Sequence, residues 1–309
     1  MDKKTKLYIL SGFLGSGKTT FLLKLLEHLK DKKVGVIMNE FGKIGIDGPI
    51  IKRDGMELME INRGSIFCSC LKISFLSAMV EMSDREMDYL IVESSGLADP
   101  SNIGDILDGI KQVKGDLYDY KGAICLIDGT GFLEQLEDLE TVERQLKHCH
   151  LAILNKVDLI DEETKNKVLE KIEEINPKVN VIETSFGDVD FKFLEEDLMK
   201  YAWAEDEETT NSVDSKPKTL SLTYDGEIQK SKLTNFLNLI SKDAYRIKGF
   251  CNLEDGINQV DVVNRRIDYK LIDRNEENSL VIISKIGPQI IKPIFAAWES
   301  EVGIEMKLR

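Results

Sequence analysis

One stretch near the start of the chain has the residue types and spacing of a phosphate-binding loop. The pattern G-x-x-x-x-G-K-[ST] is met by Gly12, Phe13, Leu14, Gly15, Ser16, Gly17, Lys18 and Thr19. Glycines in such a loop let successive backbone N–H groups close around phosphate oxygens without a clash at Cβ. Lys18 would reach the outer phosphates, Thr19 would ligate Mg²⁺, and Thr20 would also contact the nucleotide. The stretch therefore predicts a site for a nucleoside triphosphate and magnesium.

A second motif, Asn155-Lys156-Val157-Asp158, follows an apolar run and has the chemistry to bind a guanine base. The Asp158 carboxylate can accept two hydrogen bonds, from the guanine N1–H and the exocyclic amine, whereas adenine offers no such pair. An unpaired buried carboxylate costs several kcal/mol, enough for discrimination on the order of 10⁴. Asn155 would brace the loop, Lys156 would lie across the base, and Ser185 would supply a backbone N–H to the guanine carbonyl. We therefore expect GTP and GDP as ligands.

Two further segments carry carboxylates that could act on the terminal phosphate. Glu93 ends an apolar run and could hold a water of Mg²⁺, while Gly96 would let its backbone N–H approach the γ-phosphate. This segment is the predicted switch II. Glu40 and Asp47 follow another apolar run, and either could orient the attacking water or touch Mg²⁺, which makes this segment the predicted switch I. No arginine is evidently placed as a finger, so we expect intrinsic turnover on the order of 10⁻⁴ to 10⁻² s⁻¹.

These motifs need a fold that brings the ends of several strands together, and the hydrophobic pattern of the chain provides one. Short apolar runs of strand length occur at 7–10, 33–39, 57–61, 89–93, 122–128, 151–155 and 179–184. Helical or amphipathic segments lie between them, at 21–29, 72–83, 132–147, 162–175 and 191–201. The alternation predicts an α/β fold of the P-loop NTPase type, a doubly wound and mostly parallel sheet that binds ligands at the carboxyl ends of its strands.

The composition changes after Trp203, and this divides the chain into two predicted domains. Residues 204–216 are polar and acidic, which predicts an exposed linker between a nucleotide domain at 1–203 and a smaller domain at 217–309. In the second domain the order strand, helix, three strands and helix predicts an α+β, ferredoxin-like unit. Its first helix would bury Leu233, Phe236, Leu237 and Ile240 on one face.

Charge and hydropathy exclude several classes of partner. The chain of 309 residues carries a formal charge of −14, which argues against nucleic acid and anionic membranes as partners because both repel an acidic surface. No apolar run is long enough to span a bilayer, and the phosphate motif follows the start without a signal peptide. We therefore expect a cytoplasmic protein. In that reducing setting the five cysteines are core residues or metal-active thiols, not a disulfide frame.

Taken together, the motifs GFLGSGKTT, NEFG, ESSGLADP and NKVD resemble those of the CobW-type metallochaperone GTPases over residues 7–160. This family is related to the accessory GTPases of urease, hydrogenase and methylmalonyl-CoA mutase, and Glu93, where many GTPases carry aspartate, is a mark of the group. The resemblance implies slow, guanine-specific hydrolysis coupled to the handing of a metal or metallocofactor to a client protein. The client would be a metalloprotein or a corrinoid (cobalamin-type) enzyme, and the chain could act as a homodimer.

The sequence departs from the family in its cysteine motif. The family typically carries G-C-x-C-C after switch I, and here Ser65 and Phe67 replace two of the thiols, Cys68 is kept and Cys70 is added. Cys68 and Cys70 could share a Zn²⁺ or Co²⁺ ion from a turn, and a helix beginning nearby would favour thiolates. Zn²⁺ normally takes four ligands, so Glu40, a nucleotide-dependent group or a partner would have to complete the site. The alternative is a loop that has lost its metal ligands.

Three hypotheses follow. In the first, the protein is a GTP-hydrolysing metallochaperone whose Cys68 and Cys70 carry zinc or cobalt. In the second, it activates a corrinoid or other metallocofactor enzyme and carries no free metal. In the third, it is a nucleotide-gated scaffold that hydrolyses little.

The remaining cysteines and histidines have simpler interpretations. His148 and His150 could form a metal-binding pair or a cluster that ends a helix. Cys125 and Cys251 are predicted to lie in the core.

Overall fold

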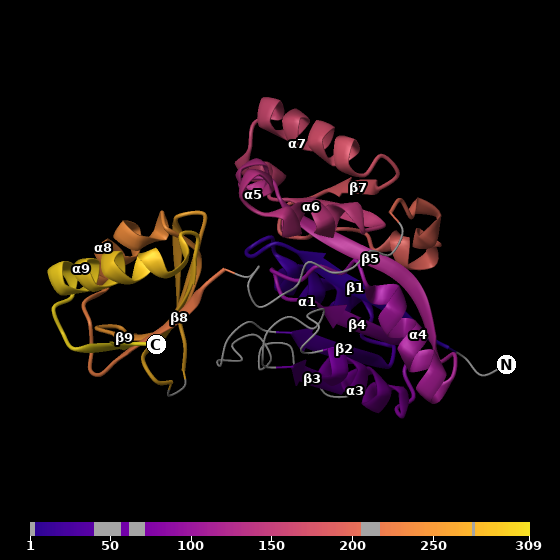
Figure 1. Cartoon of the computed structure of the whole chain (residues 1–309), viewed down its shortest axis with the longest axis horizontal. Helices are drawn as coiled ribbons and strands as arrows, with labels where there is room; N and C mark the ends of the chain where they lie inside the picture. The colour runs from indigo at the N-terminus through magenta and orange to yellow at the C-terminus, as the bar shows by residue number, and fades with distance from the viewer. Residues whose placement is uncertain (1–3, 40–56, 62–71, 205–216, 274–275) are drawn as a thin grey trace. The chain divides into compact units, whose positions relative to one another are not determined.

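The computed structural model describes residues 4–39, 57–61, 72–204, 217–273 and 276–309. The chain divides into two compact units, Met1–Ser215 and Lys216–Arg309 (Figure 1). Three predicted features fall outside the described residues: the switch I carboxylates Glu40 and Asp47, the thiols Cys68 and Cys70, and all but the first residue of the linker 204–216.

Seven parallel strands form the sheet of the first unit, among the residues that the structure describes there. Their order is β3-β2-β4-β1-β5-β6-β7. The strands are β1 (Thr5–Gly12), β2 (Val34–Asn39), β3 (Glu57–Ile61), β4 (Tyr89–Glu93), β5 (Tyr118–Asp128), β6 (Leu151–Asn155) and β7 (Asn180–Glu183). The central strand β1 pairs in parallel with β4 on one side and β5 on the other. This arrangement confirms the predicted doubly wound sheet.

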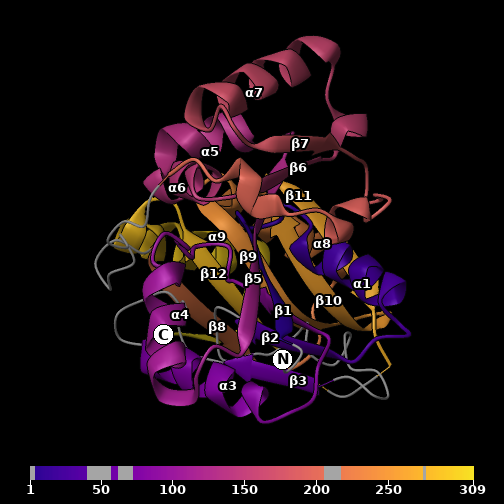
Figure 2. The ribbon, with the colours of Figure 1, turned by 90° about the vertical axis from the view of Figure 1, so that its right-hand side faces the viewer.

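Helices cover both faces of this sheet, which is why its strands are nearly continuous apolar runs. The helices are α1 (Lys18–His28), α3 (Lys72–Ser83), α4 (Ile103–Lys114), α5 (Phe132–Asp138), α6 (Glu140–Lys147) and α7 (Glu162–Ile175). Figure 2 shows α1 on one side of β1, and α3 and α4 on the other. The first face is completed by Phe191, Phe193 and Leu198, which pack in one apolar cluster with Phe21 and Tyr8.

Three details of the predicted helices are corrected by the structure. Residues 191–201 do not form one helix. They form two short 3₁₀ turns, η2 (Lys192–Glu195) and η3 (Leu198–Tyr201), whose apolar side chains pack in the cluster that contains Phe21 of α1. The segment 132–147 is two helices, separated at Leu139 by an extended backbone (φ −142°). Helix α4 was not predicted, and its Gly104 and Gly109 lower its helix propensity.

The second unit contains one antiparallel sheet of six strands among its described residues, in the order β11-β10-β9-β12-β8-β13. Its elements are β8 (Thr219–Tyr224), α8 (Lys230–Ser241), β9 (Ala244–Leu253), β10 (Gly256–Val263), β11 (Arg266–Leu271), β12 (Ser279–Ser284), η4 (Gly287–Ile290), α9 (Ile291–Glu301) and β13 (Met306–Leu308). The four strands β9-β12-β8-β13, with α8 after β8 and α9 after β12, have the predicted ferredoxin-like arrangement. The predicted face of α8 is fully buried, with Leu233, Phe236, Leu237 and Ile240 at 0% exposure.

The hairpin β10–β11 and the last strand β13 were not predicted. We expected three strands between the two helices of this unit, but the chain turns at Asn264 and Arg265, which both have positive φ (49° and 63°), so that β10 and β11 are separate strands. Two such residues form the tight turn that hairpins prefer, usually with glycine as the second residue. The Asn-Arg pair lacks that glycine, so the turn is not evident in the sequence.

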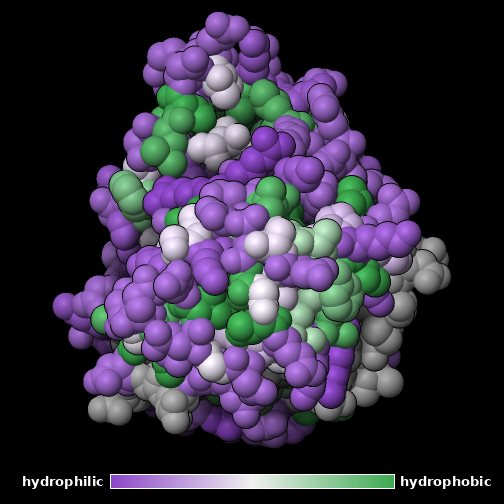
Figure 3. Space-filling view, turned by 90° about the vertical axis from the view of Figure 1, so that its left-hand side faces the viewer, coloured by the Kyte–Doolittle hydropathy of each residue, from purple (hydrophilic) through white to green (hydrophobic). Residues whose placement is uncertain are grey.

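Apolar side chains on the surface are dispersed. In the described part of the second unit, the large apolar residues with the most exposure are Leu239, Leu271, Ile286, Phe295 and Ile304. Figure 3 shows apolar surface divided into small areas by hydrophilic side chains. Single exposed apolar residues of this kind are normal on folded proteins.

Candidate nucleotide-binding site

The predicted phosphate loop lies between β1 and α1, as the motif requires. Gly17 has φ 98° and precedes the first residue of α1, Lys18. A Cβ at Gly17 would lie 2.5 Å from Nδ2 of Asn155, so a side chain here is excluded by both conformation and space. The buried Lys18 ammonium donates to the carbonyls of Gly12 (2.7 Å) and Phe13 (3.0 Å). The lysine charge is therefore held inside the loop, where it can meet phosphate oxygens.

Thr19 and Glu93 meet at the carboxyl end of the sheet. The Thr19 hydroxyl lies 3.2 Å from Oε1 of Glu93, which is the last residue of β4 and is 6% exposed. Ser94 fixes the end of β4 because its backbone N–H and its hydroxyl both donate to the carbonyl of Leu10, at 2.9 and 3.1 Å. A hydroxyl and a carboxylate are the oxygen ligands that Mg²⁺ takes in proteins, so this pair fits a magnesium ion.

Gly96 lies directly against the phosphate loop. A Cβ built on it would be 2.7 Å from the backbone nitrogen of Leu14 and 2.6 Å from Cδ2 of the same residue. The position therefore requires glycine because two backbone segments touch there, which is how the predicted switch II glycine could approach a phosphate.

Asn155 joins the phosphate loop to the predicted base-binding loops. Its Nδ2 donates to the carbonyl of Ser16 at 2.9 Å, and its Oδ1 accepts the backbone N–H of Gly187 at 3.0 Å. Asn155 is the last residue of β6 and is 2% exposed. We predicted that Asn155 braces its loop. Its two contacts are instead with Ser16 of the phosphate loop and with Gly187, which both lie outside the motif Asn155–Asp158.

Lys156 and Asp158 flank the same loop. Lys156 has a left-handed backbone (φ 65°), and its ammonium pairs at 2.7 Å with Asp128, whose side chain is fully buried. Asp128 also accepts the N–H and hydroxyl of Thr130, at 3.0 and 2.7 Å. Asp158 lies in the turn η1 (Val157–Leu159) and is exposed. Asp128 was not predicted as a site residue, although it ends an apolar strand as Glu93 does.

The loop after β7 contains Ser185, Phe186 and Gly187. Phe186 has a left-handed backbone (φ 57°) and is 70% exposed. A Cβ at Gly187 would lie 3.2 Å from Cα of Phe21, so this loop packs tightly on α1. Ser185 and the exposed Thr20 remain predicted nucleotide contacts.

The three cysteines of the described chain, and His150, lie in the protein interior. Cys125, Cys149 and Cys251 are buried, and burial raises the pKa of Cys251 to about 12. His150 accepts the backbone N–H of Ala123 on Nδ1 at 3.0 Å, and its burial lowers its pKa to about 4. Among the described residues, which exclude Cys68 and Cys70, no three His, Cys, Asp or Glu side chains are grouped so that they could hold a metal.

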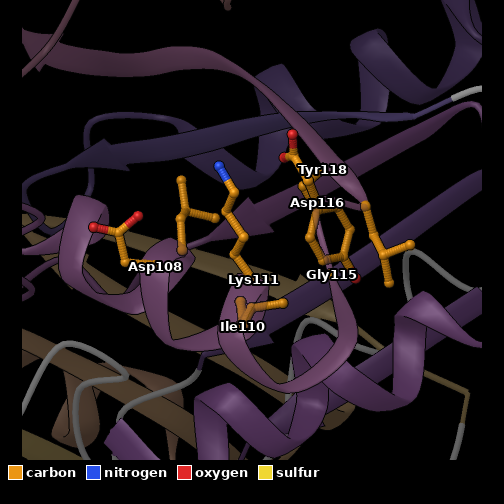
Figure 4. A pocket seen from close by; sticks show the side chains of 8 residues that line it. Asp108, Ile110, Lys111, Gly115, Asp116 and Tyr118 are labelled. Atoms are coloured by element: carbon orange, nitrogen blue, oxygen red, sulfur yellow. The ribbon is translucent and has the colours of Figure 1, made fainter.

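A separate hollow of about 170 Å³ lies where α4 leads into β5 (Figure 4). Its lining includes Asp108, Lys111, Asp116 and Tyr118. Tyr118 begins β5, whereas the residues described above lie where strands end. The hollow is therefore not part of the candidate nucleotide site.

In the described chain, no helix has the length and apolar character needed to cross a membrane.

Comparison with known families places a nucleotide domain over the site just described. Residues 6–183 match the family described as CobW/HypB/UreG, nucleotide-binding domain. Residues 218–297 match the cobalamin synthesis protein cobW C-terminal domain.

Individual relatives agree with these matches. The chain is 32% identical over 212 residues to the zinc chaperone CobW of Sinorhizobium sp., covering 59% of each protein. It is 29% identical over 192 residues to the zinc chaperone YjiA of Escherichia coli, covering 60% of this chain and 59% of that protein. It is also 29% identical over 218 residues to the zinc-regulated GTPase metalloprotein activator 1 of Saccharomyces cerevisiae, covering 62% and 51%. The matches thus span less than two thirds of each relative.

Among solved structures, Zn(II)-bound YjiA GTPase from E. coli aligns with a TM-score of 0.48 and 20% identity. That alignment covers 96% of this chain and 99% of the other.

Proposed function

Because this chain belongs to the CobW/HypB/UreG family, as the match over residues 6–183 establishes, we propose that it is a GTPase that delivers a transition metal to a client metalloprotein. The observation that carries the GTPase part is the double contact of Asn155, which ties the phosphate loop at Ser16 to the base-binding region at Gly187. A nucleotide bound across these two regions would have its phosphates at Lys18 and its base at Asp158.

Each residue of the site has a role in this proposal. Lys18 and the loop amides hold the β- and γ-phosphates, and Asp158 selects guanine. Thr19 and Glu93 would hold Mg²⁺, which when bound neutralises charge on the phosphates. Gly96 brings its backbone N–H toward the γ-phosphate, and Glu93 with a switch I carboxylate, Glu40 or Asp47, places the attacking water.

The test of the GTPase is single-turnover hydrolysis of GTP and ATP by wild type and by Lys18→Ala. We expect wild type to hydrolyse GTP slowly, on the order of 10⁻⁴ to 10⁻² s⁻¹, and to discriminate against ATP. Equal rates in wild type and Lys18→Ala would instead favour a nucleotide-gated scaffold. Equal competition by ATP and GTP for the site would contradict guanine specificity.

Metal delivery is supported by the relatives named zinc chaperones and by the thiols Cys68 and Cys70. The metal would be of the zinc or cobalt class and would move when the nucleotide state changes. Titration of wild type and of the Cys68→Ser/Cys70→Ser double variant with Zn²⁺ and Co²⁺, each with GDP and with a non-hydrolysable GTP analogue, tests this. We expect tight binding that depends on both thiols and on the nucleotide.

A second function is favoured by Ser65 and Phe67, which replace two thiols typical of the family. In this alternative the protein activates a corrinoid or other metallocofactor enzyme without carrying free metal. Unchanged tight Zn²⁺ binding in the double variant would reject the thiol site. GTP hydrolysis without any tight metal binding would support the activator.

A further inference from the structure

Helix α6 holds the outer side of the loop that follows Glu93. Arg144 Nε donates to Oδ2 of Asp99 at 2.8 Å, and its NH2 group donates to the Ser101 hydroxyl at 2.9 Å. Asp99 has no exposed surface, and the Arg144 side chain is only 12% exposed. A buried carboxylate is stable only when it is paired, so this contact fixes residues 99–101 to α6.

The next residue of α6 contacts the same loop closer to the phosphates. Gln145, which is 1% exposed, donates through Nε2 to the carbonyls of Gly96 (3.3 Å) and Ala98 (2.8 Å). The two neighbouring side chains therefore contact the loop at both ends of the segment 96–101. We call Arg144 and Gln145 together the α6 clamp.

Asn176 contacts the end of the helix that carries the clamp. Nδ2 of Asn176, at the end of α7, donates to the carbonyls of Leu146, Lys147 and Cys149, at 3.0, 3.2 and 3.0 Å. Asn176 is 1% exposed. Leu146 and Lys147 are the last two residues of α6, and Cys149 follows the helix closely, so one buried amide holds the end of the helix that carries the clamp.

Gly96 connects the clamp to the proposed chemistry, because it touches the phosphate loop at Leu14. We propose that Arg144 and Gln145 are positioning residues for GTP hydrolysis, which hold Gly96 at the distance from the phosphate loop that the γ-phosphate requires. This inference rests on the proposed GTPase function. It adds that the predicted switch II is set in place by α6, whose sequence leads through β6 into Asn155 and the base-binding loop.

The experiment compares wild type with Arg144→Gln, Arg144→Lys and Asp99→Asn in the full chain. We measure single-turnover GTP hydrolysis, affinity for GDP, and hydrogen exchange of residues 94–102. Arg144→Gln should lower hydrolysis by about tenfold to a hundredfold, because small misplacements of a reacting group cost this much. Affinity for GDP, which lacks the γ-phosphate, should stay within about threefold. Arg144→Lys keeps the charge but not the two directed hydrogen bonds, so it should restore only part of the rate.

Glu140→Gln is the matched control. Glu140 lies 4.0 Å from NH1 of Arg144 on the exposed side of the same helix, so its loss leaves the contact with Asp99 intact. It should behave as wild type. The proposal is wrong if Arg144→Gln hydrolyses GTP at the wild-type rate, or if it loses GDP affinity and hydrolysis in equal measure.

Hydrogen exchange separates this inference from the proposed function. If wild type hydrolysed no GTP, the GTPase proposal would fail. Faster exchange of residues 94–102 in Arg144→Gln would then still support the clamp, and unchanged exchange would reject it.

Discussion

Thr19 and Glu93 are 74 residues apart in sequence, yet the hydroxyl of one and the carboxylate of the other lie 3.2 Å apart. Thr19 belongs to the first turn of α1, which follows β1. Glu93 ends β4, the strand next to β1, so the parallel sheet itself brings the two residues together. The positive end of α1 and the nearby Lys18 favour negative charge at this place, which suits a phosphate and its cation.

Glu93→Gln should weaken the binding of Mg²⁺ more than the binding of nucleotide. The variant keeps the shape of the side chain but removes its charge, so the Mg²⁺ concentration needed for half-maximal hydrolysis should rise about 10-fold to 100-fold. A magnesium titration of GTP hydrolysis measures this. Glu86→Gln is the control, since Glu86 is an exposed carboxylate paired with Lys33. An unaltered magnesium dependence in Glu93→Gln would remove Glu93 from the metal site.

Gly96→Ala should reduce hydrolysis more than it reduces GDP binding. The added Cβ would overlap the Leu14 nitrogen at 2.7 Å, so the loop after β4 must move away from the phosphate loop. We expect a loss of about tenfold to a hundredfold in single-turnover rate. Gly109→Ala in α4 serves as the comparison because its Cβ would meet only the flexible end of Leu76, at 3.1 Å. Equal effects of the two substitutions would show that contact with Leu14 has no special role.

Asp158→Asn should change the preferred base. The asparagine NH₂ cannot accept from the guanine amine, but it can donate to the carbonyl that xanthine carries at the same position. Affinity for GTP should fall at least about 100-fold, while xanthosine triphosphate should bind more tightly than GTP. Competition binding with the two nucleotides measures the change. Asp161→Asn, at the exposed start of α7, should leave the preference for guanine intact, and a guanine preference retained by Asp158→Asn would contradict our assignment.

The stability of the nucleotide unit should fall in mildly acidic solution because of His150. Burial is the main cause that lowers its pKa from 6.5 to about 4, and the charge of His148 adds to the effect while that of Asp197 opposes it. The unfolded chain therefore takes up a proton that the folded chain does not. Above pH 6.5 the histidine is neutral in both states and causes no loss. As the pH falls from 6.5 to 4, the free energy of unfolding decreases by about 2–3 kcal/mol.

Denaturant unfolding between pH 4 and 7 measures this loss. His150→Gln, whose amide oxygen can accept the same N–H, should show a smaller slope in that range. Identical slopes for wild type and variant would mean that another group controls the acid sensitivity.

The sequence was sufficient for the parts of the site that local chemistry determines. Glycines before Lys18 and Thr19, and carboxylates at strand ends, are tied to neighbouring residues, so their positions in the fold followed from the alternation of strands and helices. The predicted faces of α8 and the buried Cys125 and Cys251 were correct for the same reason.

Contacts between segments that are distant in sequence could not be predicted from local sequence patterns. Nothing near Arg144 in sequence indicates that it pairs with Asp99, because their meeting depends on how α6 packs beside the loop after β4. Gly187 is likewise held by Asn155 from another strand. Helix α4 and the Asn264-Arg265 turn were missed because each uses residues with weak local preference for the conformation they adopt.

The borders of the second sheet restrict how its unit can recognise another protein. One border, β11, exposes the charged Arg266, Asp268 and Lys270, and the other, β13, is only three residues long. Charged and very short border strands both discourage an incoming chain from adding itself to a sheet. A client that docks on this unit should therefore be bound through side chains of the helices or of the sheet surface, and should not need to offer an extended, unpaired backbone of its own.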